Sequence, residues 1–191
     1  MQTDYVDLYQ LHGGTLEDPI DETIEAFEVL KQQGKIRHYG ISSIRPNVIR
    51  EYAKKSNIIS VMMQYSLLDR RPEEQSLDLL REHNISVLAR GSYAQGLLLG
   101  KPVKPYLQHS AESVRKAAEA LKAVAHKEQS LAAIAGRFVL AHPAVASAVL
   151  GIRTSAQLEE ALLVADAVPL NEEQLQELKQ SIAVHPYEQH R

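Results

Sequence analysis

The chain contains no cysteine. This absence excludes disulfide bonds, catalysis by a thiolate, and zinc or iron–sulfur sites held by cysteine. The chain also lacks any run of about 18 apolar residues, the length that a membrane-spanning helix needs. Its N-terminus does not show the basic-then-apolar pattern of a secretion signal. We therefore expect a cytoplasmic protein with no membrane partner.

Neither sign of charge is in large excess. The 24 acidic and 21 basic side chains give a net charge of −3 and a pI near 6.2. A general nucleic-acid binder is normally basic, so we expect no nucleic-acid partner. Hydrophobic residues make up 45% of the 191 residues and charged residues 24%, which is ordinary for a globular chain. Because no linker or low-complexity segment divides it, we predict a single domain over residues 1–191.

Several familiar motifs are missing. No G-x-G-x-x-G follows the first apolar run, so a Rossmann dinucleotide site is not supported. The eight histidines form neither H-x-H nor H-E-x-x-H, so no metal site is expected. The glycine-rich segment GSYAQGLLLGK is not a phosphate loop, because Leu97 follows Gly96 and neither Ser nor Thr follows Lys101.

The chain instead alternates short apolar runs with longer amphipathic segments. The apolar runs predict five strands, over residues 5–11, 36–41, 58–64, 85–89 and 146–150. The first amphipathic segment predicts a helix from an Asp18 N-cap, with Pro19 as its first residue, to a stop at Gly34. Further helices are predicted over residues 47–55, 73–83, 111–127, 131–142 and 155–165, with a last one from Asn171.

Five strands that are each followed by a helix predict a parallel α/β sheet with right-handed crossovers. Composition leaves two architectures open, an open doubly wound sheet and part of a TIM barrel. In both, functional residues gather at the carboxyl ends of the strands. The ends of these strands carry His12, Ser42 with Ser43, Gln64, residues 90–92 and residues 151–154.

The middle strand ends carry groups that suit one polar cofactor. The hydroxyls of Ser42 and Ser43 and the amide of Gln64 can hydrogen-bond a carboxamide, and the planar guanidinium of Arg90 can lie against an aromatic ring.

The last strand end suits a phosphate. Gly151 allows close backbone approach, and Arg153 lies beside a helix that Thr154 can cap. Because a helix N-terminus is electropositive, an adjacent cation makes this a candidate anion site.

Five motifs resemble the carboxyl-terminal portion of the aldo-keto reductase family, whose members fold as a (β/α)₈ barrel. In family order the motifs are DYVDLYQLH, GKIRHYGISS, VMMQYSLLDR, VLARGSYAQGLLLG and VASAVLGIRTSAQLEEAL. They resemble strands four to eight, so the resemblance implies an incomplete TIM barrel. It also implies the family's activity, the reduction of aldehydes and ketones to alcohols with NADPH (NADP+) as cofactor and a small carbonyl compound as substrate.

The resemblance implies a role for each strand-end residue. His12 would be the catalytic histidine that orients the carbonyl. The nicotinamide carboxamide and ring would be held by Ser42, Ser43, Gln64 and Arg90. The pyrophosphate would be lined by Gly91, Ser92, Tyr93, Gln95 and Gly96. The adenosine and its 2′-phosphate would be bound by Gly151, Arg153, Thr154, Gln157 and Glu160.

Three positions depart from the family pattern. Ser43 replaces the usual asparagine, Arg90 stands where many members have a tyrosine that stacks on the nicotinamide, and Ala161 stands where an asparagine commonly contacts adenine.

The same residues also have structural interpretations. Thr154 and Gln157 form the T-x-x-Q pattern of an ordinary capping box. Gln64 could satisfy a strand-end backbone group, Ser42 and Ser43 could be turn residues, and Arg90 could be half of a buried ion pair. The joint occurrence of these residues at matched strand ends favours the cofactor interpretation.

In the family, the catalytic aspartate, tyrosine and lysine precede the strand with which this sequence starts. None of the eight tyrosines here occupies that tyrosine's position. A closed barrel needs eight strands and about 250 residues. We therefore expect a truncated reductase that retains only His12 and turns over no carbonyl by itself, its missing segment being encoded upstream or supplied by another polypeptide. The alternative is a non-catalytic NADP(H)-binding or interaction module.

Missing strands would also change the surface of the molecule. Open sheet edges favour self-association. Inward-facing side chains would lose their opposite layer, and we expect these to be Val6, Leu8, Val61 and Met63.

Overall fold

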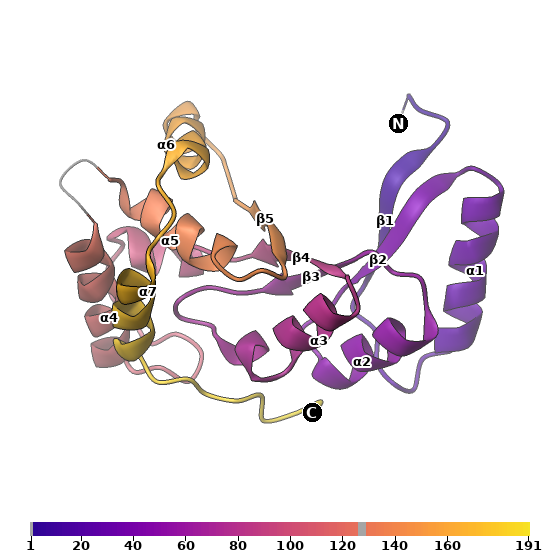
Figure 1. The fold of residues 1–191 in the computed structure, drawn as a ribbon, viewed down its shortest axis with the longest axis horizontal. Helices are drawn as coiled ribbons and strands as arrows, with labels where there is room; N and C mark the ends of the chain where they lie inside the picture. Colours follow the sequence, from indigo (N-terminus) through magenta and orange to yellow (C-terminus); the bar gives the residue numbers. More distant parts are fainter. Residues whose placement is uncertain (1, 126–128) are drawn as a thin grey trace.

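A parallel five-stranded sheet forms the centre of the computed structural model, which describes residues 2–125 and 129–191. The strands pair in chain order, and every pair is parallel. Their bounds are β1 Val6–His12, β2 Ile36–Ser42, β3 Ser60–Gln64, β4 Ser86–Arg90 and β5 Val145–Val149. The predicted parallel α/β fold is therefore confirmed (Figure 1).

Helices follow the strands as expected. They are α1 Ile20–Gln32, α2 Pro46–Lys55, the 3₁₀ segment η1 Arg71–Glu74, α3 Ser76–Glu82, the 3₁₀ segment η2 Ala94–Leu99, α4 Ala111–Val124, α5 Leu131–Leu140, α6 Ser155–Asp166 and α7 Glu172–Gln180. The helix predicted over residues 111–127 corresponds to α4, and residues 126–127 of that prediction lie outside the described residues. Within residues 2–125 and 129–191, none of the helices has both the length and the apolar character that crossing a bilayer demands.

Two predicted helix boundaries are wrong for local reasons. Asp18 does not cap α1: Pro19 is the N-cap, and the Asp18 carboxylate accepts a hydrogen bond from the Thr15 N–H at 2.6 Å instead. A short polar side chain often bonds a nearby loop amide in this way. The helix predicted over residues 73–83 is two segments, η1 and α3, because Gln75 between them has φ −151°.

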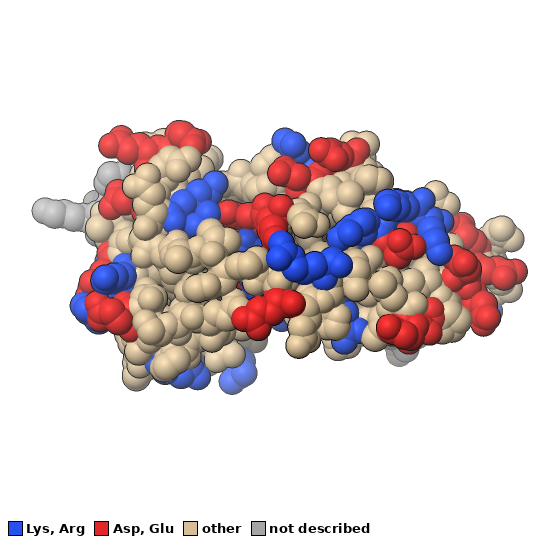
Figure 2. All heavy atoms as spheres, turned by 90° about the horizontal axis from the view of Figure 1, so that it is seen from below, with Lys and Arg blue, Asp and Glu red and all other residues tan. Residues whose placement is uncertain are grey.

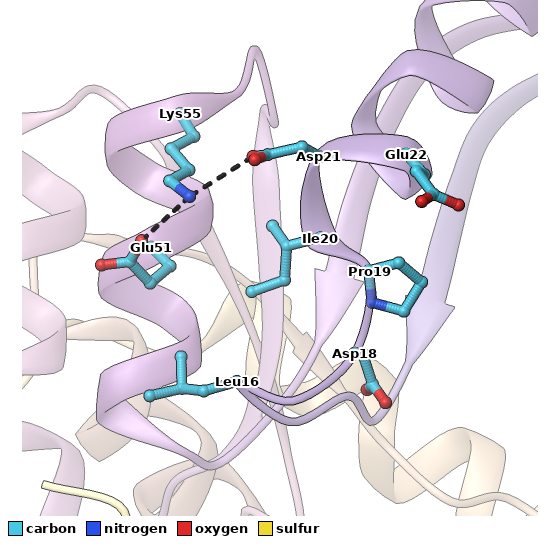
Figure 3. A pocket seen from close by; sticks show the side chains of 8 residues that line it. All are labelled: Leu16, Asp18, Pro19, Ile20, Asp21, Glu22, Glu51 and Lys55. Atoms are coloured by element: carbon cyan, nitrogen blue, oxygen red, sulfur yellow. Dashed lines mark hydrogen bonds and ion pairs between the residues drawn. The ribbon is translucent and has the colours of Figure 1, made fainter.

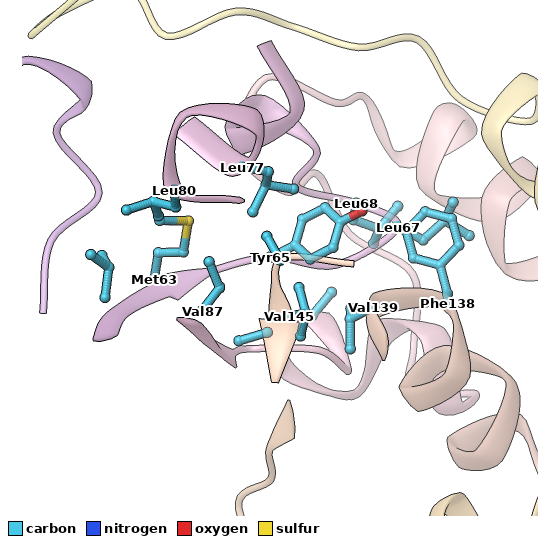
Figure 4. Close-up of a cluster of buried hydrophobic side chains, with 14 of the residues drawn as sticks. Met63, Tyr65, Leu67, Leu68, Leu77, Leu80, Val87, Phe138, Val139 and Val145 are labelled. Carbon is cyan, nitrogen blue, oxygen red and sulfur yellow. The ribbon is translucent and has the colours of Figure 1, made fainter. Parts of the chain in front are cut away.

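One face of the sheet, here called the covered face, packs against helices. Val61 and Met63 of β3 and Val87 and Ala89 of β4 point to this side and are at most 1% exposed. Side chains of α3 and α5 close over them, among them Leu80 beside Met63 (Figure 4). Tyr65 continues this core, with its ring centroid 6.1 Å from that of Phe138 on α5. Burial of this face supplies the main driving force for folding.

The opposite face, here called the bare face, has no helix over it among the described residues (Figure 1). Side chains alternate along a strand, and the register places Ser42, Met62, Leu88 and Ser147 side by side on this face. Met62 and Leu88 are half-buried, and Ser147 is exposed. Val61 and Met63, which we expected to lose their opposite layer, instead face the helices; Val6 and Leu8 do lie on the bare face and are half-buried.

The strands of the bare face still approach one another closely. A Cβ on Gly40 of β2 would lie 2.4 Å from the Ser60 carbonyl oxygen, so only glycine fits there. Because Gly40 has no side chain, the Gln10 amide of β1 can reach across β2 and donate to the Ser60 hydroxyl, at 3.2 Å.

Helix α6 is attached to the rest of the molecule by few buried side chains. Only Val164 is buried in it, and this valine packs on α5 at Gly136, where a Cβ would lie 2.5 Å from a Val164 methyl group. Leu158, Leu162 and Leu163 of α6 are 47%, 58% and 49% exposed. Most residues of α5, in contrast, are buried. The stability of α6 therefore depends mainly on interactions within the helix and at its ends.

Charges of both signs are interspersed over the surface that Figure 2 shows, the underside of the view in Figure 1. No broad field of one sign covers that face, which matches the small net charge of −3.

Candidate cofactor site and active site

The carboxyl ends of the first four strands meet at one edge of the sheet. His12 of β1 is in register with Ser42 of β2, and Gln64 of β3 is in register with Arg90 of β4. Ser42 is in register with Met62, two residues before Gln64, so all four side chains lie on the bare face. The structure thus brings together His12, Ser42, Gln64 and Arg90 from four separate segments.

The turn after His12 is held by backbone bonds and one arginine. The Gly13 N–H donates to the Ser42 carbonyl at 2.9 Å, and Gly13 and Gly14 have φ of +91° and +100°, values that favour glycine. The Arg45 guanidinium donates to the Gly14 carbonyl at 2.5 Å. His12 itself is exposed. Its imidazole is therefore presented to solvent from a fixed turn.

Ser43 lies just beyond the end of β2 and is 6% exposed. Its hydroxyl oxygen accepts a hydrogen bond from the Arg45 N–H at 3.1 Å, as in a serine turn. Its hydroxyl proton stays available for a further acceptor, so the turn interpretation and the binding interpretation are compatible at this residue.

Gln64 is the centre of a hydrogen-bond network that the sequence did not predict. Its amide nitrogen donates to the Asp69 carboxylate at 2.9 Å and to the Tyr106 hydroxyl at 3.0 Å. Its amide oxygen accepts from Arg90 at 3.1 Å. Asp69 also forms a two-point ion pair with Arg71, at 2.7 and 2.8 Å. The only sequence cue was the charge triplet DRR a few residues after the strand, a common surface pattern.

Most of the remaining predicted residues line a cleft of about 700 Å³ between the β4–η2 loop and the β5–α6 junction. Of the predicted site, the lining includes Gly91, Ser92, Tyr93, Gln95, Gly96, Gly151, Arg153, Gln157 and Glu160. The cleft and the strand-end group are continuous, since a Cβ on Gly91 would lie 3.2 Å from the Gln64 side chain. Ala161 also lines the cleft, whereas Thr154 does not.

One wall of the cleft is a left-handed stretch of backbone. Ala94, Gln95 and Gly96 have φ of +46°, +60° and +90°. The N–H groups of Ala94 and Gly96 already donate to the carbonyls of Gly91 and Tyr93. Ser92 is buried, and its hydroxyl lies 3.5 Å from the Ala89 carbonyl.

A cation that the sequence did not single out for binding lies on this wall. The Lys101 ammonium donates to the Gln95 carbonyl at 3.0 Å and packs over Gly96, where a Cβ would come within 2.8 Å of its side chain. It lines the cleft. The sequence predicts no role for Lys101, because its segment is not a phosphate loop; in the structure the fold of the surrounding loop places this side chain at the cleft.

The Tyr93 hydroxyl is buried in the cleft region without a hydrogen-bond partner among the described residues. Burial and the negative charge of Glu160 raise the pKa of Tyr93 to about 12. The phenol is therefore protonated at neutral pH and has an unused donor.

The other wall begins at the N-terminus of α6. The Thr154 hydroxyl accepts from the Gln157 N–H at 3.2 Å, and the Gln157 amide oxygen accepts from the Arg153 N–H at 2.8 Å. In a capping box the Gln157 oxygen would accept from the N–H of the N-cap residue, Thr154. Here it accepts from the N–H of Arg153, one residue earlier, so the capping box expected for T-x-x-Q is not formed. The Arg153 guanidinium is exposed and pairs with no side chain of the described residues.

A second hollow, of about 470 Å³, lies between the start of α1 and helix α2 (Figure 3). Its lining includes Asp18, Asp21, Glu22 and Glu51, and Lys55 pairs with Asp21 at 3.3 Å and with Glu51 at 3.5 Å. None of the predicted site residues lines it, so it is separate from the candidate site.

The sequence model of the aldo/keto reductase family matches residues 1–183. The chain belongs to this family. The resemblance inferred from the five motifs is thereby confirmed at the level of the family, an oxidoreductase family that uses NAD(P)H.

Several known proteins are similar to this chain over all or nearly all of its length. An uncharacterized oxidoreductase, YqkF of Bacillus subtilis, is 52% identical over 200 residues and aligns with 100% of this chain and 65% of its own length. The holo form of aldo-keto reductase AKR11C1 from Bacillus halodurans is 48% identical with a TM-score of 0.90, over 100% of this chain and 63% of that one. The glycerol dehydrogenase AKR11B4 from Gluconobacter oxydans is 25% identical with a TM-score of 0.82, over 93% of this chain and 58% of that one. The chain therefore spans less than two thirds of the length of these relatives, from 58% to 65%.

Proposed function

We propose that the chain is the NADPH-binding part of an aldo/keto reductase and corresponds to strands four to eight of the family's barrel. The observation that carries this proposal is the register of the strand ends, which gathers His12, Ser42, Gln64 and Arg90 at one edge. The bare face of the sheet and the relatives' greater length support it. A closed eight-stranded barrel would cover that face from within.

The cleft residues fit the adenosine and phosphate end of a nicotinamide cofactor. Lys101 and Arg153 supply positive charge, Glu160 and the Gln157 amide supply polar partners, and Tyr93 has an unused buried donor. In this proposal Gly91, Ser92, Tyr93, Gln95 and Gly96 line the pyrophosphate, and Gly151, Arg153, Thr154, Gln157 and Glu160 bind the adenosine and its 2′-phosphate. Within residues 2–125 and 129–191 the exposed Arg153 guanidinium has no side-chain partner, and a guanidinium in this state favours NADPH over NADH.

The strand-end residues would hold the reacting part of the cofactor and the substrate. Ser42, Ser43 and Gln64 hydrogen-bond the carboxamide, and Arg90 lies against the ring. When bound, the cofactor supplies the hydride for carbonyl reduction. His12 donates a hydrogen bond to the oxygen of a small aldehyde or ketone and orients it, since an imidazole N–H is a suitable donor.

No tyrosine, lysine or aspartate of this chain is assigned to the proton-donating step. We therefore propose that the chain by itself binds NADPH and turns over no carbonyl, its three catalytic partners belonging to a preceding segment or another polypeptide. A non-catalytic NADP(H)-binding module is the alternative. A cytoplasmic location and self-association through the edges of β1 and β5 also stay predictions.

Titration of the purified chain with NADPH, followed by cofactor fluorescence, tests this proposal. We expect saturable binding that Arg153→Ala weakens by at least about 10-fold, the cost of losing a charge-assisted hydrogen bond. NADH lacks the 2′-phosphate, so its affinity should hardly change. Arg115→Ala, on the exposed surface of α4, is the matched control and should leave both affinities unchanged.

Three results would contradict the proposal. Absence of saturable NADPH binding would remove the cofactor site, and equal losses for NADPH and NADH in Arg153→Ala would remove the 2′-phosphate assignment. NADPH oxidation with an aldehyde, abolished by His12→Ala, would show that the chain is catalytically complete.

A further inference from the structure

Asp69 occupies an unusual position for a carboxylate, since it is 1% exposed at the rim of the candidate site. Both its oxygens are engaged. One accepts from the Arg71 Nε at 2.7 Å, and the other accepts from an Arg71 terminal nitrogen at 2.8 Å and from the Gln64 amide nitrogen at 2.9 Å. A buried charge needs such compensation to be tolerated. The carboxylate is therefore fixed in place beside Gln64.

An ionised carboxylate can only accept hydrogen bonds. Because it touches the Gln64 amide, the amide group that faces Asp69 is the NH₂ and not the oxygen. The second proton of the same NH₂ is directed to the Tyr106 hydroxyl, at 3.0 Å. Both donors of the Gln64 amide are thus consumed inside the protein.

The Gln64 oxygen is what remains for a ligand. It accepts one bond from Arg90, at 3.1 Å, and an amide oxygen can accept two. Gln64 consequently offers one acceptor and no donor. A carboxamide has an NH₂ donor and a carbonyl acceptor, and only its NH₂ complements this arrangement.

We propose that Asp69 is a positioning residue that locks Gln64 as an acceptor, so that Gln64 recognises the NH₂ of the nicotinamide carboxamide. This inference rests on the proposed function. The carbonyl of the carboxamide is then left to donors on neighbouring strand ends, and Ser42 and Ser43 have hydroxyl protons for it. Arg71 keeps Asp69 in place and lies 4.7 Å from the ring centroid of Tyr187, which connects the C-terminal tail to the site.

Three ligands that differ at the nicotinamide test the proposal by calorimetric titration. They are NADP+, its 3-acetylpyridine analogue, in which a methyl replaces the amide NH₂, and 2′-phospho-ADP-ribose, which has no nicotinamide. The unmodified chain should bind NADP+ about 3- to 10-fold more tightly than the acetylpyridine analogue, the effect of one net hydrogen bond.

Asp69→Asn should abolish or reverse this preference. When the asparagine places its NH₂ toward Gln64, this NH₂ donates to the Gln64 oxygen. The Gln64 amide then turns, gives up its bond from Arg90 and presents its own NH₂, which suits the acetyl oxygen. The affinity for 2′-phospho-ADP-ribose should not change. Tyr106→Phe, a milder substitution, frees one Gln64 proton and should reduce the preference in the same direction.

A matched control uses the neighbouring ion pair of Arg70 and Glu73. Its charged groups are 2.7 Å apart and largely buried, as in the Asp69 pair, but it does not contact Gln64. Glu73→Gln should leave the preference intact. The proposal is overturned by an unchanged preference in Asp69→Asn, or in Tyr106→Phe if Asp69→Asn does not fold. It is also overturned if Asp69→Asn weakens all three ligands equally. If the unmodified chain binds none of the three ligands, the proposed function fails as well; if it binds all three without preference, only this inference fails.

Discussion

Met62 and Met63 are adjacent residues of the same strand with opposite surroundings. Met63 is on the covered face and 1% exposed, whereas Met62 is half-buried on the bare face. The same contrast holds along β4 for Ala89 and Leu88. The covered face is a finished hydrophobic core, while the bare face carries the candidate strand-end site. Stability and binding thus reside on opposite sides of one sheet.

The contrast explains how the sheet can be well ordered without a second layer. Helices α2, α3 and α5 bury the covered face, and backbone hydrogen bonds between strands do not depend on which face is covered. The bare face contributes polar groups such as Gln64 and Arg90, which interact with each other.

The largest expected effect on stability comes from truncating Met63, and the same truncation of Met62 is the comparison. Met63→Ala should lower the free energy of unfolding by about 2–5 kcal/mol, because it removes a fully buried side chain and leaves a cavity. Met62→Ala should cost less than about 1 kcal/mol, because a partly exposed side chain loses little burial. Urea unfolding of both variants, at low protein concentration, measures the difference.

Equal losses of unfolding free energy in the two variants would contradict the difference between the two faces. They would mean that the bare face is covered in solution, as it would be in a self-associated form. Repeating the unfolding over a range of protein concentrations would then show a concentration-dependent midpoint.

The assignment of faces illustrates what the sequence could and could not predict. Alternation and apolar runs predicted five parallel strands, because strand formation depends on local periodicity, but they left the order of the strands in the sheet open. The face of Val61 and Met63 was predicted wrongly, because the alternation along β3 separates these two side chains from Ser60, Met62 and Gln64 but does not say which of the two sets faces the helices. A strand of this kind is oriented only by what packs on it.

The candidate site shows the same limit. Strand ends predicted His12, Ser42, Gln64 and Arg90 as neighbours, since parallel strands end at one edge. Asp69 and Tyr106 were missed, because their contact with Gln64 depends on loops whose path no local pattern specifies.

Helices α6 and α5 should also differ in how far the effect of a helix-cap mutation spreads. Thr154→Ala removes the cap of α6, which contributes only Val164 to the buried set, whereas Ser130→Ala removes the equivalent cap of the buried helix α5. Each cap is worth about 1 kcal/mol. Thr154→Ala should speed amide exchange within α6 and leave global unfolding nearly unchanged, and Ser130→Ala should lower global stability.

Hydrogen exchange together with denaturant unfolding separates the two cases. A fall in global stability in Thr154→Ala as large as that in Ser130→Ala would show that α6 unfolds together with the core, contrary to the burial pattern.

The smallest expected effect is a pH dependence that comes from buried histidines. Burial lowers the pKa of His109 below 6.5, and the positive charge of His185, whose ring centroid lies 4.8 Å away, lowers it further. Burial also lowers the pKa of His142. Because the unfolded chain binds protons more readily at these positions, the free energy of unfolding should fall as the pH drops below about 6.5.

The free energy of unfolding at pH 7.5 and at about pH 5.5 measures this effect and stays above the pH range in which carboxylates become protonated. Burial raises the pKa of Glu73, but Arg70 outweighs it and holds that pKa below 4.5, so its contribution is lost only at lower pH. His109→Gln should reduce the drop between the two pH values. His38→Gln, at an exposed position of the bare face, is the matched control and should retain it. Stability that rises on acidification over this range would contradict the burial of His109, since a buried neutral histidine makes protonation favour the unfolded chain.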